Sequence, residues 1–423
     1  MITKKPINQT KPMNSWEADI LGGRLQPGTD PGKSQYEVSL VMPCLNEADT
    51  LATCIGKAKR ALEENHINGE VVIADNGSTD GSQDIAKRLG ARVVNVTKRG
   101  YGSALMGGIE ASLGKYVIMG DADDSYDWLE TPKFVAKLRE GFDLVQGCRL
   151  PVGGGRVMPG AMPKSHRWLG NPGLTWLARQ WFGVPFNDVY CGMRGFTREL
   201  YDRLDLRSRG MEFATEMLIK ASRYKAKVSE TPITLHKDGR IAHPPHLRTI
   251  RDGWRTLRFF LLSSPRWLFY RPGAALIMAG LVGYVLAMFD IRVGGIHFAM
   301  NSMIFSSLAL ITGFQGIMFA VAMKTLAVAT GVQPRDKRLD HFYEVVTVER
   351  GAIAGVVGMV LGLVMLSIVV VDWGMVGFKD LNYEQTLRWT IPGAVLTALS
   401  FQTIFFSFFL GVLNGLQAHL KDE

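Results

Sequence analysis

The sequence has few cysteines, and they lie far apart. The four are Cys44, Cys54, Cys148 and Cys191, and none belongs to a C-x-x-C pair. This spacing indicates neither a disulfide framework nor a zinc site and favours reduced, structural cysteines. The composition also excludes a disordered, collagen-like or disulfide-rich secreted protein, because 47% of the 423 residues are hydrophobic and 21% are charged. A chain of this length predicts two or three folded domains.

Acidic residues are the minority among the charged ones. Lysines and arginines number 48 against 39 aspartates and glutamates, which gives a net charge of +9. A basic excess is typical of proteins that bind nucleic acid, anionic lipid or acidic substrates, and composition alone does not choose among them. The chain begins without the apolar segment of a cleaved signal peptide. Residues 1–35, rich in Lys, Pro, Asn and Gly, are predicted to be a disordered tail.

Charged residues almost vanish from four stretches after residue 271. We expect a transmembrane domain over 272–418, with helices at about 272–290, 298–323, 351–371 and 391–416. About 20 apolar residues are needed to cross about 30 Å of hydrocarbon as a helix. The first stretch is at the short end of that range, so a buried core helix is its alternative. Four such runs in succession favour a membrane protein.

The basic residues between these stretches predict the orientation. Six arginines precede the first span and five lysines or arginines follow the second, whereas the other two loops hold one and two. Loops rich in Lys and Arg stay in the cytoplasm. We therefore expect an integral protein of the inner or plasma membrane, with both termini, the N-terminal half and the loop 324–350 in the cytoplasm.

Between residues 36 and 147 the sequence alternates between strand and helix patterns. Strands are expected at 38–42, 70–74, 91–96, 116–120 and 143–146, and helices at 48–64, from 80, and at 102–113 and 131–140. This alternation predicts a mainly parallel sheet with helices on both faces. Ligands of such folds bind at the carboxyl ends of the strands. Here those ends carry Glu47, Asp75 and the residues 121–124.

The most acidic of these strand ends is a turn with four carboxylates. They belong to Asp121, Asp123, Asp124 and Asp127. Such crowding is repulsive unless a cation compensates it, and carboxylate oxygens suit Mg²⁺ or Mn²⁺. Mg²⁺ usually binds through one or two carboxylates together with substrate phosphates. The alternative is a solvated acidic turn in which Asp124 caps a helix.

Two further turns are weaker signals. The first, D-N-G-S-T-D at 75–80, follows a strand, with Gly77 suited to a tight turn and Asp80 to a helix N-cap, so an ordinary capped turn is its alternative. The second, G-Y-G-S-A at 100–104, begins a helix whose amides could face a phosphate. That segment lacks the fingerprints of dinucleotide and P-loop sites.

The order of these motifs is more specific than any one of them. P-x-x-N-E at 43–47, D-N-G-S-T-D, G-Y-G-S-A and D-A-D-D at 121–124 together resemble the family 2 glycosyltransferases of the GT-A fold. The dolichyl- and polyprenyl-phosphate mannose or glucose synthases are the branch that the later motifs resemble: Q-G-C-R at 146–149, D-V-Y-C-G-M-R at 188–194, F-A-T-E-M at 213–217 and P-I-T at 232–234. The resemblance covers roughly residues 37–258.

This resemblance implies an α/β fold and a reaction. The fold is a GT-A, Rossmann-like catalytic domain over 36–245, followed by interfacial helices over 246–271 and the four-helix transmembrane domain. The reaction is an inverting transfer of a hexose from a nucleotide sugar, of the GDP-mannose or UDP-glucose type, to an undecaprenyl or dolichyl monophosphate. That phosphate has a second pKa of about 6 and is already a nucleophile, so no tuned general base is required.

The resemblance also implies roles for individual residues. The nucleotide-sugar site would contain Pro43, Glu47, Asp75, Asn76, Gly102, Asp121 and Ala122. Asp121 and Asp123 would hold Mg²⁺ or Mn²⁺ on the diphosphate. The acceptor phosphate would face Arg149, Arg167 and Asn171. The catalytic set would be Asp123, Arg149, Arg167 and Arg240, the last in a loop that closes over the donor in the family.

Two positions depart from the family pattern. Asn76 stands where a second aspartate is usual, and Ser125 stands where the family often has a glutamine metal ligand. The metal ligands beyond the two aspartates and the choice of nucleotide base therefore stay open.

The segment 246–271 joins the two halves. Apolar residues recur at helical spacing in it, including Trp254 and Leu257, with five arginines or aspartates elsewhere around the helix. The pattern predicts a helix in the headgroup plane, with its basic face toward anionic lipid. A soluble helix packed on the catalytic domain is the alternative.

Two other functions are alternatives to polyprenyl-phosphate glycosylation. A processive polysaccharide synthase usually carries Q-x-x-R-W, of which only Arg167 and Trp168 are present. A non-catalytic scaffold or lipid flippase would not need Asp75, Asp121 and Asp123, and the four predicted spans hold no interior charge that would mark a transport path. No nucleic acid is expected as a partner, and the oligomeric state, a homo-oligomer included, stays open.

Overall fold

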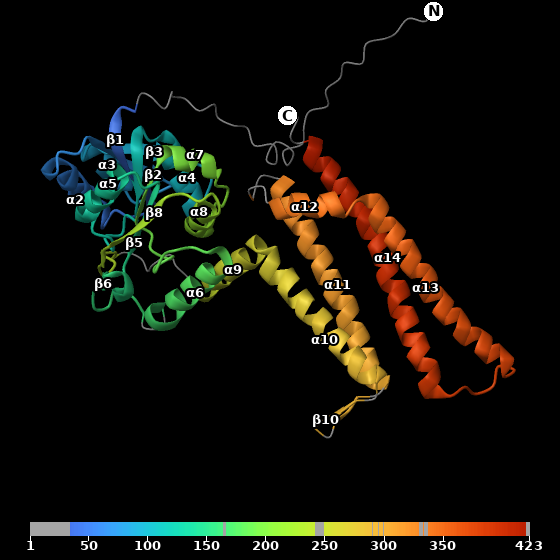
Figure 1. The fold of residues 1–423 in the computed structure, drawn as a ribbon. Helices are drawn as coiled ribbons and strands as arrows, with labels where there is room; N and C mark the ends of the chain where they lie inside the picture. The colour runs from blue at the N-terminus through green and yellow to red at the C-terminus, as the bar shows by residue number, and fades with distance from the viewer. Residues whose placement is uncertain are drawn as a thin grey trace, which may run out of the picture.

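The computed structural model describes residues 34–163, 166–241, 249–289, 291–294, 296–298, 300–329, 333 and 337–419. The predictions for residues 1–33 and 246–248 lie outside the described residues. Within them, an α/β part reaches to residue 241, and a helical part follows from α9 (Thr249–Ser263) onward (Figure 1).

A seven-stranded sheet organises the α/β part. Its order is β3-β2-β1-β4-β7-β5-β8, and only β7 runs antiparallel to its neighbours. The strands are β1 (Tyr36–Cys44), β2 (Gly69–Asp75), β3 (Arg92–Asn95), β4 (Gly114–Met119), β5 (Leu144–Cys148), β7 (Arg194–Thr197) and β8 (Val228–Pro232). A second, two-stranded sheet pairs β6 (Arg156–Val157) with β9 (Thr234–Leu235). The predicted mainly parallel sheet is confirmed.

Helices cover both faces of the large sheet. One face carries α2 (Leu51–Glu64), α3 (Ser82–Arg88), the short turn η1 (Trp128–Glu130) and α5 (Thr131–Arg139). The other carries α4 (Tyr101–Ala111), α6 (Asn171–Phe182), α7 (Arg198–Leu204) and α8 (Glu212–Arg223). Each predicted helix in this part is therefore present, with bounds within a few residues of those expected.

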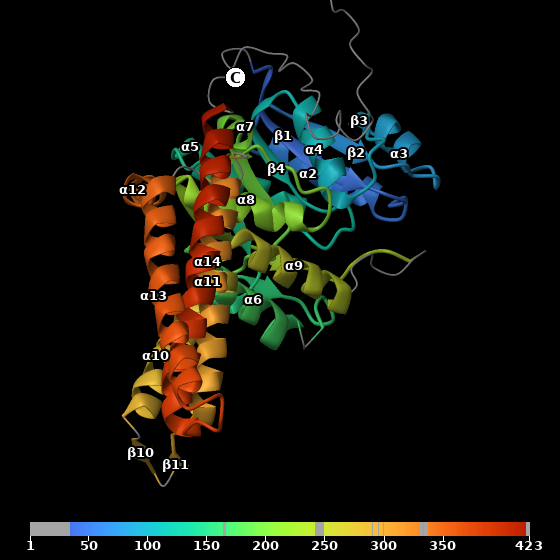
Figure 2. The same ribbon diagram turned by 90° about the vertical axis from the view of Figure 1, so that its right-hand side faces the viewer.

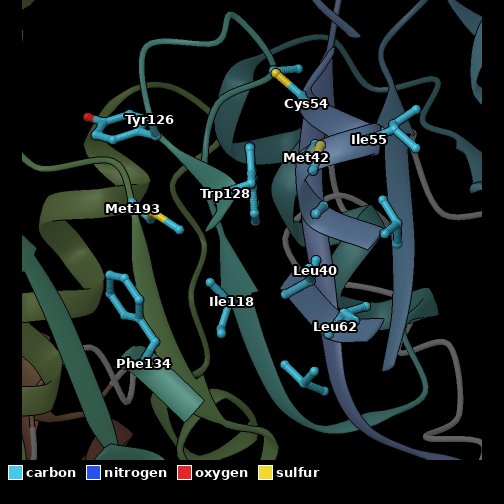
Figure 3. Packing of buried hydrophobic residues seen from close by; sticks show 14 of the residues in the cluster. Leu40, Met42, Cys54, Ile55, Leu62, Ile118, Tyr126, Trp128, Phe134 and Met193 are labelled. Atoms are coloured by element: carbon cyan, nitrogen blue, oxygen red, sulfur yellow. The ribbon is translucent and has the colours of Figure 1, made fainter. Parts of the chain in front are cut away.

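Strand β1 shows how the sequence forms a sheet that is buried on both faces. Leu40 and Met42 belong to the core on one face, and Val41 belongs to the core on the other. Figure 3 shows Leu40 and Met42 next to Ile55 of α2, with Trp128 beside them. A strand buried on both faces needs a continuous apolar run rather than an alternating one, and β1 has such a run.

Four apolar helices make up most of the helical part. They are α10 (Arg271–Met288), α11 (Met300–Ala329), α13 (Val348–Met375) and α14 (Tyr383–His419), and each is long and apolar enough to cross a membrane. Two hairpins are formed, α10 with α11 and α13 with α14, and α11 also packs on α14 (Figure 2). The short helix α12 (Lys337–Val345) lies at the end nearer the α/β part, and the strands β10 (Arg292–Val293) and β11 (Ile296–His297) lie at the other (Figure 1).

Three of these helices, α11, α13 and α14, are longer than the predicted spans. The fourth begins at Tyr383 rather than near 391, because the side chain of Asn382 accepts a hydrogen bond from the amide of Gln385 at 3.2 Å. Helix α11 continues to Ala329, beyond the expected end near 323. Hydropathy finds the apolar centre of a helix, whereas capping decides where its polar ends stop.

Helix α9 and the π-helical turn η4 (Arg266–Tyr270) connect the two parts. Phe260 of α9 is fully buried against Phe182 of α6, with the ring centres 5.4 Å apart. Trp267 of η4 stacks on Trp181 at 5.3 Å. The described part of the predicted interfacial segment, 249–271, is thus packed on the α/β part, as in the alternative reading, while Trp254 is exposed. Its position in the headgroup plane stays a prediction.

Candidate active site

The candidate site lies at the carboxyl edge of strands β1, β2 and β4. Strand β1 lies between the other two and runs parallel to both. Cys44 at the end of β1 pairs with Asp75 at the end of β2, and Val41 pairs with Met119 of β4. The turns that follow these strands therefore meet at one edge, which brings Glu47, Asp75 and the acidic turn together as the sequence predicts.

The acidic turn divides into two pairs of carboxylates. Lys57 of α2 places its Nζ 2.8 Å from Asp124 and 3.9 Å from Asp127. Asp127 also accepts a hydrogen bond from the amide of Leu129 and so caps η1, whereas Asp124 adopts a left-handed backbone conformation (φ 60°). Lys57 therefore compensates the charge of two of the four carboxylates, although nothing in the local sequence predicts this contact. The residue that caps the helical turn is Asp127, not Asp124.

Asp123 belongs to the other pair and faces a basic side chain. Its Oδ1 accepts hydrogen bonds from Ser125, at 3.0 Å from the amide and 2.6 Å from the hydroxyl. Its Oδ2 lies 3.1 Å from a guanidinium nitrogen of Arg240, which also pairs with Glu47 at 2.7 Å and with Asp238 at 2.7 Å. The structure thus joins three residues that the sequence predicts separately: Glu47, Asp123 and Arg240.

Asp121 completes this pair and is partly buried. Its Oδ1 accepts a hydrogen bond of 2.8 Å from the hydroxyl of Tyr101. Burial and, after it, the charge of Asp123 raise the pKa of Asp121 to about 7, although the hydrogen bond from Tyr101 acts to lower it. Its Oδ2 lies beside Gly192, where an added Cβ would be only 3.1 Å away. The carboxylate therefore stands in a confined place in which a cation would be stabilising.

These two aspartates fit a metal that is held partly by substrate. Among the described residues, no group of three or more His, Cys, Asp or Glu side chains forms a ready metal site. Asp121 and Asp123 supply two hard oxygen donors, and a Mg²⁺ or Mn²⁺ ion would take its remaining ligands from phosphates and water, which is the usual arrangement for Mg²⁺. The donor set thus suits a metal bound together with a diphosphate.

The segment that carries Arg240 lies across the acidic turn. Its backbone amides donate to the turn at two points, His236 to Ser125 at 2.8 Å and Gly239 to Asp123 at 3.0 Å. The amide of Ile241 donates to the carboxylate of Asp49 at 3.0 Å. The loop expected to close over the donor is therefore in contact with the predicted metal ligand Asp123 in this structure.

The residues predicted at the nucleotide hold their own turns together. Asp75 accepts hydrogen bonds from the amide of Gly77 at 3.0 Å and from Gln83 at 2.7 Å. Asn76 donates to the carbonyls of Val96 and Lys98 at 2.9 and 2.8 Å, and thereby fixes the loop before α4. Asp75 thus lies at the carboxyl edge of the sheet, in a turn that its own hydrogen bonds hold in place. The side-chain amide of Asn76 instead donates to the loop before α4.

Two other residues predicted at the nucleotide site, Pro43 and Ala122, are held in the fold through their backbones. Pro43 pairs with Ala74 at the end of β1, and the carbonyl of Ala122 accepts a hydrogen bond of 2.7 Å from Thr50. The N-cap of α3 is Gly81 rather than the expected Asp80. Asp80 instead accepts hydrogen bonds from Ser82 just inside that helix.

The glycines at the start of α4 let this helix end pack closely against the segment 208–213. The amide of Ser103, which the sequence places within reach of a phosphate, donates to the carbonyl of Arg209 at 3.2 Å. A Cβ added at Gly102 would lie 2.8 Å from the Cβ of Phe213. Because the segment around Arg209 covers this helix end, the expected phosphate-facing amides are not open here, and a nucleotide contact of Gly102 stays a prediction.

Arg149 is buried in a two-point ion pair with Asp188. Its Nε and Nη2 lie 2.8 and 2.9 Å from the two carboxylate oxygens, and the side chains are 8% and 0% exposed. Its third nitrogen, Nη1, lies 3.4 Å from the hydroxyl of Tyr126, which in turn accepts from the amide of Gly192 at 2.8 Å. Arg149 thus fixes the segment 188–194, and Asp188 is a structural partner that the motif contained without its role being evident.

Arg167 and Asn171 lie on a different segment from the carboxylates. Arg167 belongs to the π-helical turn η3 (His166–Gly170) and lies 5.6 Å from the ring centre of its neighbour Trp168, which is 75% exposed. Asn171 begins α6. Among the described residues, no hydrogen bond or ion pair joins these two side chains to Asp121, Asp123 or Arg149. Of the three predicted acceptor residues, Arg149 is therefore buried, whereas Arg167 and Asn171 are partly exposed.

Comparisons with known proteins place the chain in a family. The sequence matches the family described as glycosyl transferase family 2 over residues 39–205, and the glycosyltransferase family 2 C-terminal transmembrane region over 321–414. The low-salt glycan biosynthesis hexosyltransferase Agl6 of Haloferax volcanii is 37% identical over 379 residues, which cover 89% of each chain. This chain belongs to glycosyltransferase family 2. With its four apolar helices, it is an integral membrane glycosyltransferase.

Other relatives are less similar. Glycosyltransferase AglJ of Haloferax volcanii is 30% identical over 291 residues, or 67% of this chain and 91% of that protein. A dolichyl-phosphate hexose transferase of the same organism is 29% identical over 197 residues, or 47% of this chain and 82% of that protein. Among solved structures, a glucosyl-3-phosphoglycerate synthase from Mycobacterium tuberculosis aligns with a TM-score of 0.43 and 24% identity, over 56% of this chain and 85% of that one.

Proposed function

We propose that this family 2 glycosyltransferase moves a hexose from a nucleotide sugar, of the GDP-mannose or UDP-glucose type, to a polyprenyl monophosphate. The observation that carries the proposal is the pair Asp121 and Asp123 at the carboxyl edge of the sheet, with Arg240 beside them, in a domain that continues through α9 into membrane helices. A diphosphate-linked donor and a lipid-borne acceptor suit these two features together. The names of two relatives, a hexosyltransferase and a dolichyl-phosphate hexose transferase, support the sugar class and the acceptor class.

The donor would bind along the edge formed by the turns after β1, β2 and β4. Glu47 and Asp75 would face the nucleoside, together with Pro43, Asn76, Gly102 and Ala122. Asp121 and Asp123 would hold Mg²⁺ or Mn²⁺, and the ion, when bound, would neutralise charge on the leaving diphosphate. Arg240 would exchange its present partners for the diphosphate, since a guanidinium binds phosphate as readily as carboxylate.

The acceptor phosphate would be held by Arg149, Arg167 and Asn171. One of its oxygens attacks the anomeric carbon of the hexose from the side opposite the diphosphate. The new carbon–oxygen bond forms as the bond to the nucleoside diphosphate breaks, and the departing diphosphate keeps that electron pair, so the configuration inverts. Because the attacking phosphate is ionised at neutral pH, the enzyme needs alignment and charge neutralisation rather than a general base.

The test uses the purified full-length protein in detergent. It is incubated with Mg²⁺, undecaprenyl or dolichyl phosphate, and in turn radiolabelled GDP-mannose and UDP-glucose, and the mixture is then extracted with organic solvent. The expected result is label in the lipid phase with one donor, abolished by EDTA and restored by Mg²⁺ or Mn²⁺. The variant Asp123→Asn should give no product while it unfolds at the wild-type temperature. Label that grows into a water-soluble polymer, or full activity in chelator, would contradict the proposal.

A further inference from the structure

We propose that the hydroxyls of Tyr101 and Ser125 are positioning groups that each hold one oxygen of a metal-binding aspartate, so that Asp121 and Asp123 each offer a single oxygen to the cation. The inference rests on the metal role proposed above for these two aspartates. It assigns a function to Tyr101, which the sequence motif contained without a role, and to Ser125, which stands where a metal ligand is often found in the family.

The first aspartate is held from a distant element. Tyr101 is the first residue of α4, and its hydroxyl donates to Oδ1 of Asp121 at 2.8 Å. Gly192, from a third segment, contributes no side chain beside Oδ2 of Asp121; a Cβ there would lie 3.1 Å from that oxygen and 3.1 Å from the hydroxyl of Tyr126. The hydroxyl of Tyr101 thus occupies Oδ1 of Asp121, whereas Oδ2 lies beside Gly192, which has no side chain.

The second aspartate shows the same division. Ser125 donates to Oδ1 of Asp123 through both its amide and its hydroxyl, at 3.0 and 2.6 Å. The other oxygen, Oδ2, receives the positively charged guanidinium of Arg240 at 3.1 Å. A cation therefore already contacts the oxygen that the proposal assigns to the metal, which is independent evidence that this oxygen suits positive charge.

The chemistry of Mg²⁺ explains why one oxygen is useful. Mg²⁺ demands near-ideal octahedral geometry and short bonds, which a carboxylate meets best with one oxygen, whereas a free carboxylate can rotate and present two. A hydrogen bond to the other oxygen fixes the orientation of the ligand. Loss of such a supporting group typically lowers metal affinity about 10–100-fold. Because the hydroxyl of Ser125 already donates to Asp123, it acts on the metal through that carboxylate.

The test measures cation binding directly rather than through activity. Mn²⁺ affinity is determined by electron paramagnetic resonance of free Mn²⁺ with the full-length protein, once with saturating UDP and once with saturating GDP. Tyr101→Phe and Ser125→Ala should each weaken Mn²⁺ binding about 10-fold. Ser125→Thr should bind nearly as tightly as the wild type because it keeps the hydroxyl. Nucleotide affinity without metal, by calorimetry, should be the same for all four proteins.

Two controls separate positioning from folding. Tyr201→Phe removes the hydroxyl of another buried tyrosine, which stacks on Phe196 of β7, and should leave Mn²⁺ affinity unchanged. In an Asp121→Asn background, Tyr101→Phe should cause no further loss, because the carboxylate through which it acts has already been altered. A loss of equal size in both backgrounds, or wild-type Mn²⁺ affinity in Tyr101→Phe and Ser125→Ala, would overturn the inference.

The outcomes also separate this inference from the proposed function. If the variants bind Mn²⁺ like the wild type while the wild type glycosylates polyprenyl phosphate, the positioning role is wrong and the function stands. If Mn²⁺ binding falls as expected but no lipid product forms, the acceptor is wrong and the positioning role stands. A wild-type protein that binds no divalent cation with either nucleotide would overturn both.

Discussion

Arg240 would have one role in the free protein and another when the proposed donor is bound. In this structure its guanidinium pairs with Glu47, Asp123 and Asp238 and so compensates carboxylates that would otherwise repel one another. A metal or a diphosphate would compete for the same partners. In the proposed function, the residue would therefore oppose cation binding in the free protein and favour the charged donor once it is bound.

We predict that Arg240→Ala has opposite effects on these two states. Without nucleotide, the variant should bind Mn²⁺ more tightly than the wild type, because no guanidinium competes at Asp123. The transfer rate should fall by roughly one to two decades, which corresponds to a charge-assisted contact of about 1.5–3 kcal/mol. Titration of free Mn²⁺ and the lipid-extraction assay measure the two effects.

The matched control for Arg240→Ala is Arg139→Ala. Arg139 pairs with Glu37 at 2.6 Å at a distance from the site and is half exposed, so its loss should change neither quantity. Arg240→Lys should recover only part of the rate because the planar fork is lost. Weaker Mn²⁺ binding in Arg240→Ala would show that the arginine supports the cation rather than competing with it.

The two arginines assigned to the acceptor call for different tests because their surroundings differ. Arg149 pairs with the fully buried Asp188, and removal of one partner from a buried pair costs about 3–5 kcal/mol. Arg149→Ala should therefore unfold at lower temperature, which confounds any activity measurement. Arg167 is partly exposed in η3, and Arg167→Ala should keep the wild-type unfolding temperature.

We therefore predict that Arg167→Ala lowers transfer to polyprenyl phosphate about 10-fold or more with unchanged nucleotide affinity. Asp75→Ala should do the opposite and weaken nucleotide binding first. Calorimetry with the nucleotide and a rate measurement at varied lipid concentration distinguish the two. If Arg167→Ala bound nucleotide poorly and used lipid normally, the residue would belong to the donor site.

The sequence indicated the charged residues of the site better than their partners. Asp121 and Asp123 were recognisable because they stand in the D-A-D-D motif after a predicted strand, and Arg240 was indicated by the family resemblance. Their partners Lys57 and Tyr101 were not, since each reaches the acidic turn through tertiary packing from a separate helix. Local sequence encodes where a side chain lies along its own element, and it does not encode which other element comes to meet it.

At the scale of elements, alternation predicted strands β1 to β5 and did not predict β7 or β8. Strands β1 to β5 and their helices follow the pattern of apolar runs and polar turns. Strand β7 is inserted antiparallel between β4 and β5 after a segment of more than 40 residues, and no local pattern specifies such a pairing. This insertion matters for the site, because the segment 188–193 that leads into β7 brings Gly192 to Asp121.

The membrane helices pack through glycines, which gives a prediction for the hairpin α13–α14. A Cβ added at Gly355 would lie 2.9 Å from the carbonyl oxygen of Ser400 on α14. The helices must separate to accept it, and overpacking of this kind costs about 1–3 kcal/mol. Gly355→Ala should therefore lower the unfolding temperature in detergent. Gly374→Ala, on the same helix with only an ordinary contact at 3.8 Å, is the control and should not.

At the scale of the whole molecule, the four spans place two sets of connections at opposite ends. The α/β part, α12 and the end of α14 lie at one end of the helices (Figure 1). The strands β10 and β11 and the connection between α13 and α14 lie at the other. The number of spans was predictable from hydropathy, whereas their pairing into two hairpins was not, because apolar helices of similar composition give no signal of which neighbours they choose.

The last prediction concerns which end faces the cytoplasm. The end that holds the α/β part also holds the basic residues before α10 and around α12, and such residues resist transfer across the membrane. We expect a cysteine at Lys379, between α13 and α14, to be labelled by an impermeant maleimide from outside intact cells, and a cysteine at Lys337 in α12 to be labelled only after permeabilisation. The native background is low, because Cys44, Cys54, Cys148 and Cys191 are all buried. Labelling of Lys337→Cys alone in intact cells would reverse the topology, and it would place the nucleotide-sugar site on the side of the membrane where cytoplasmic nucleotide sugars cannot reach it.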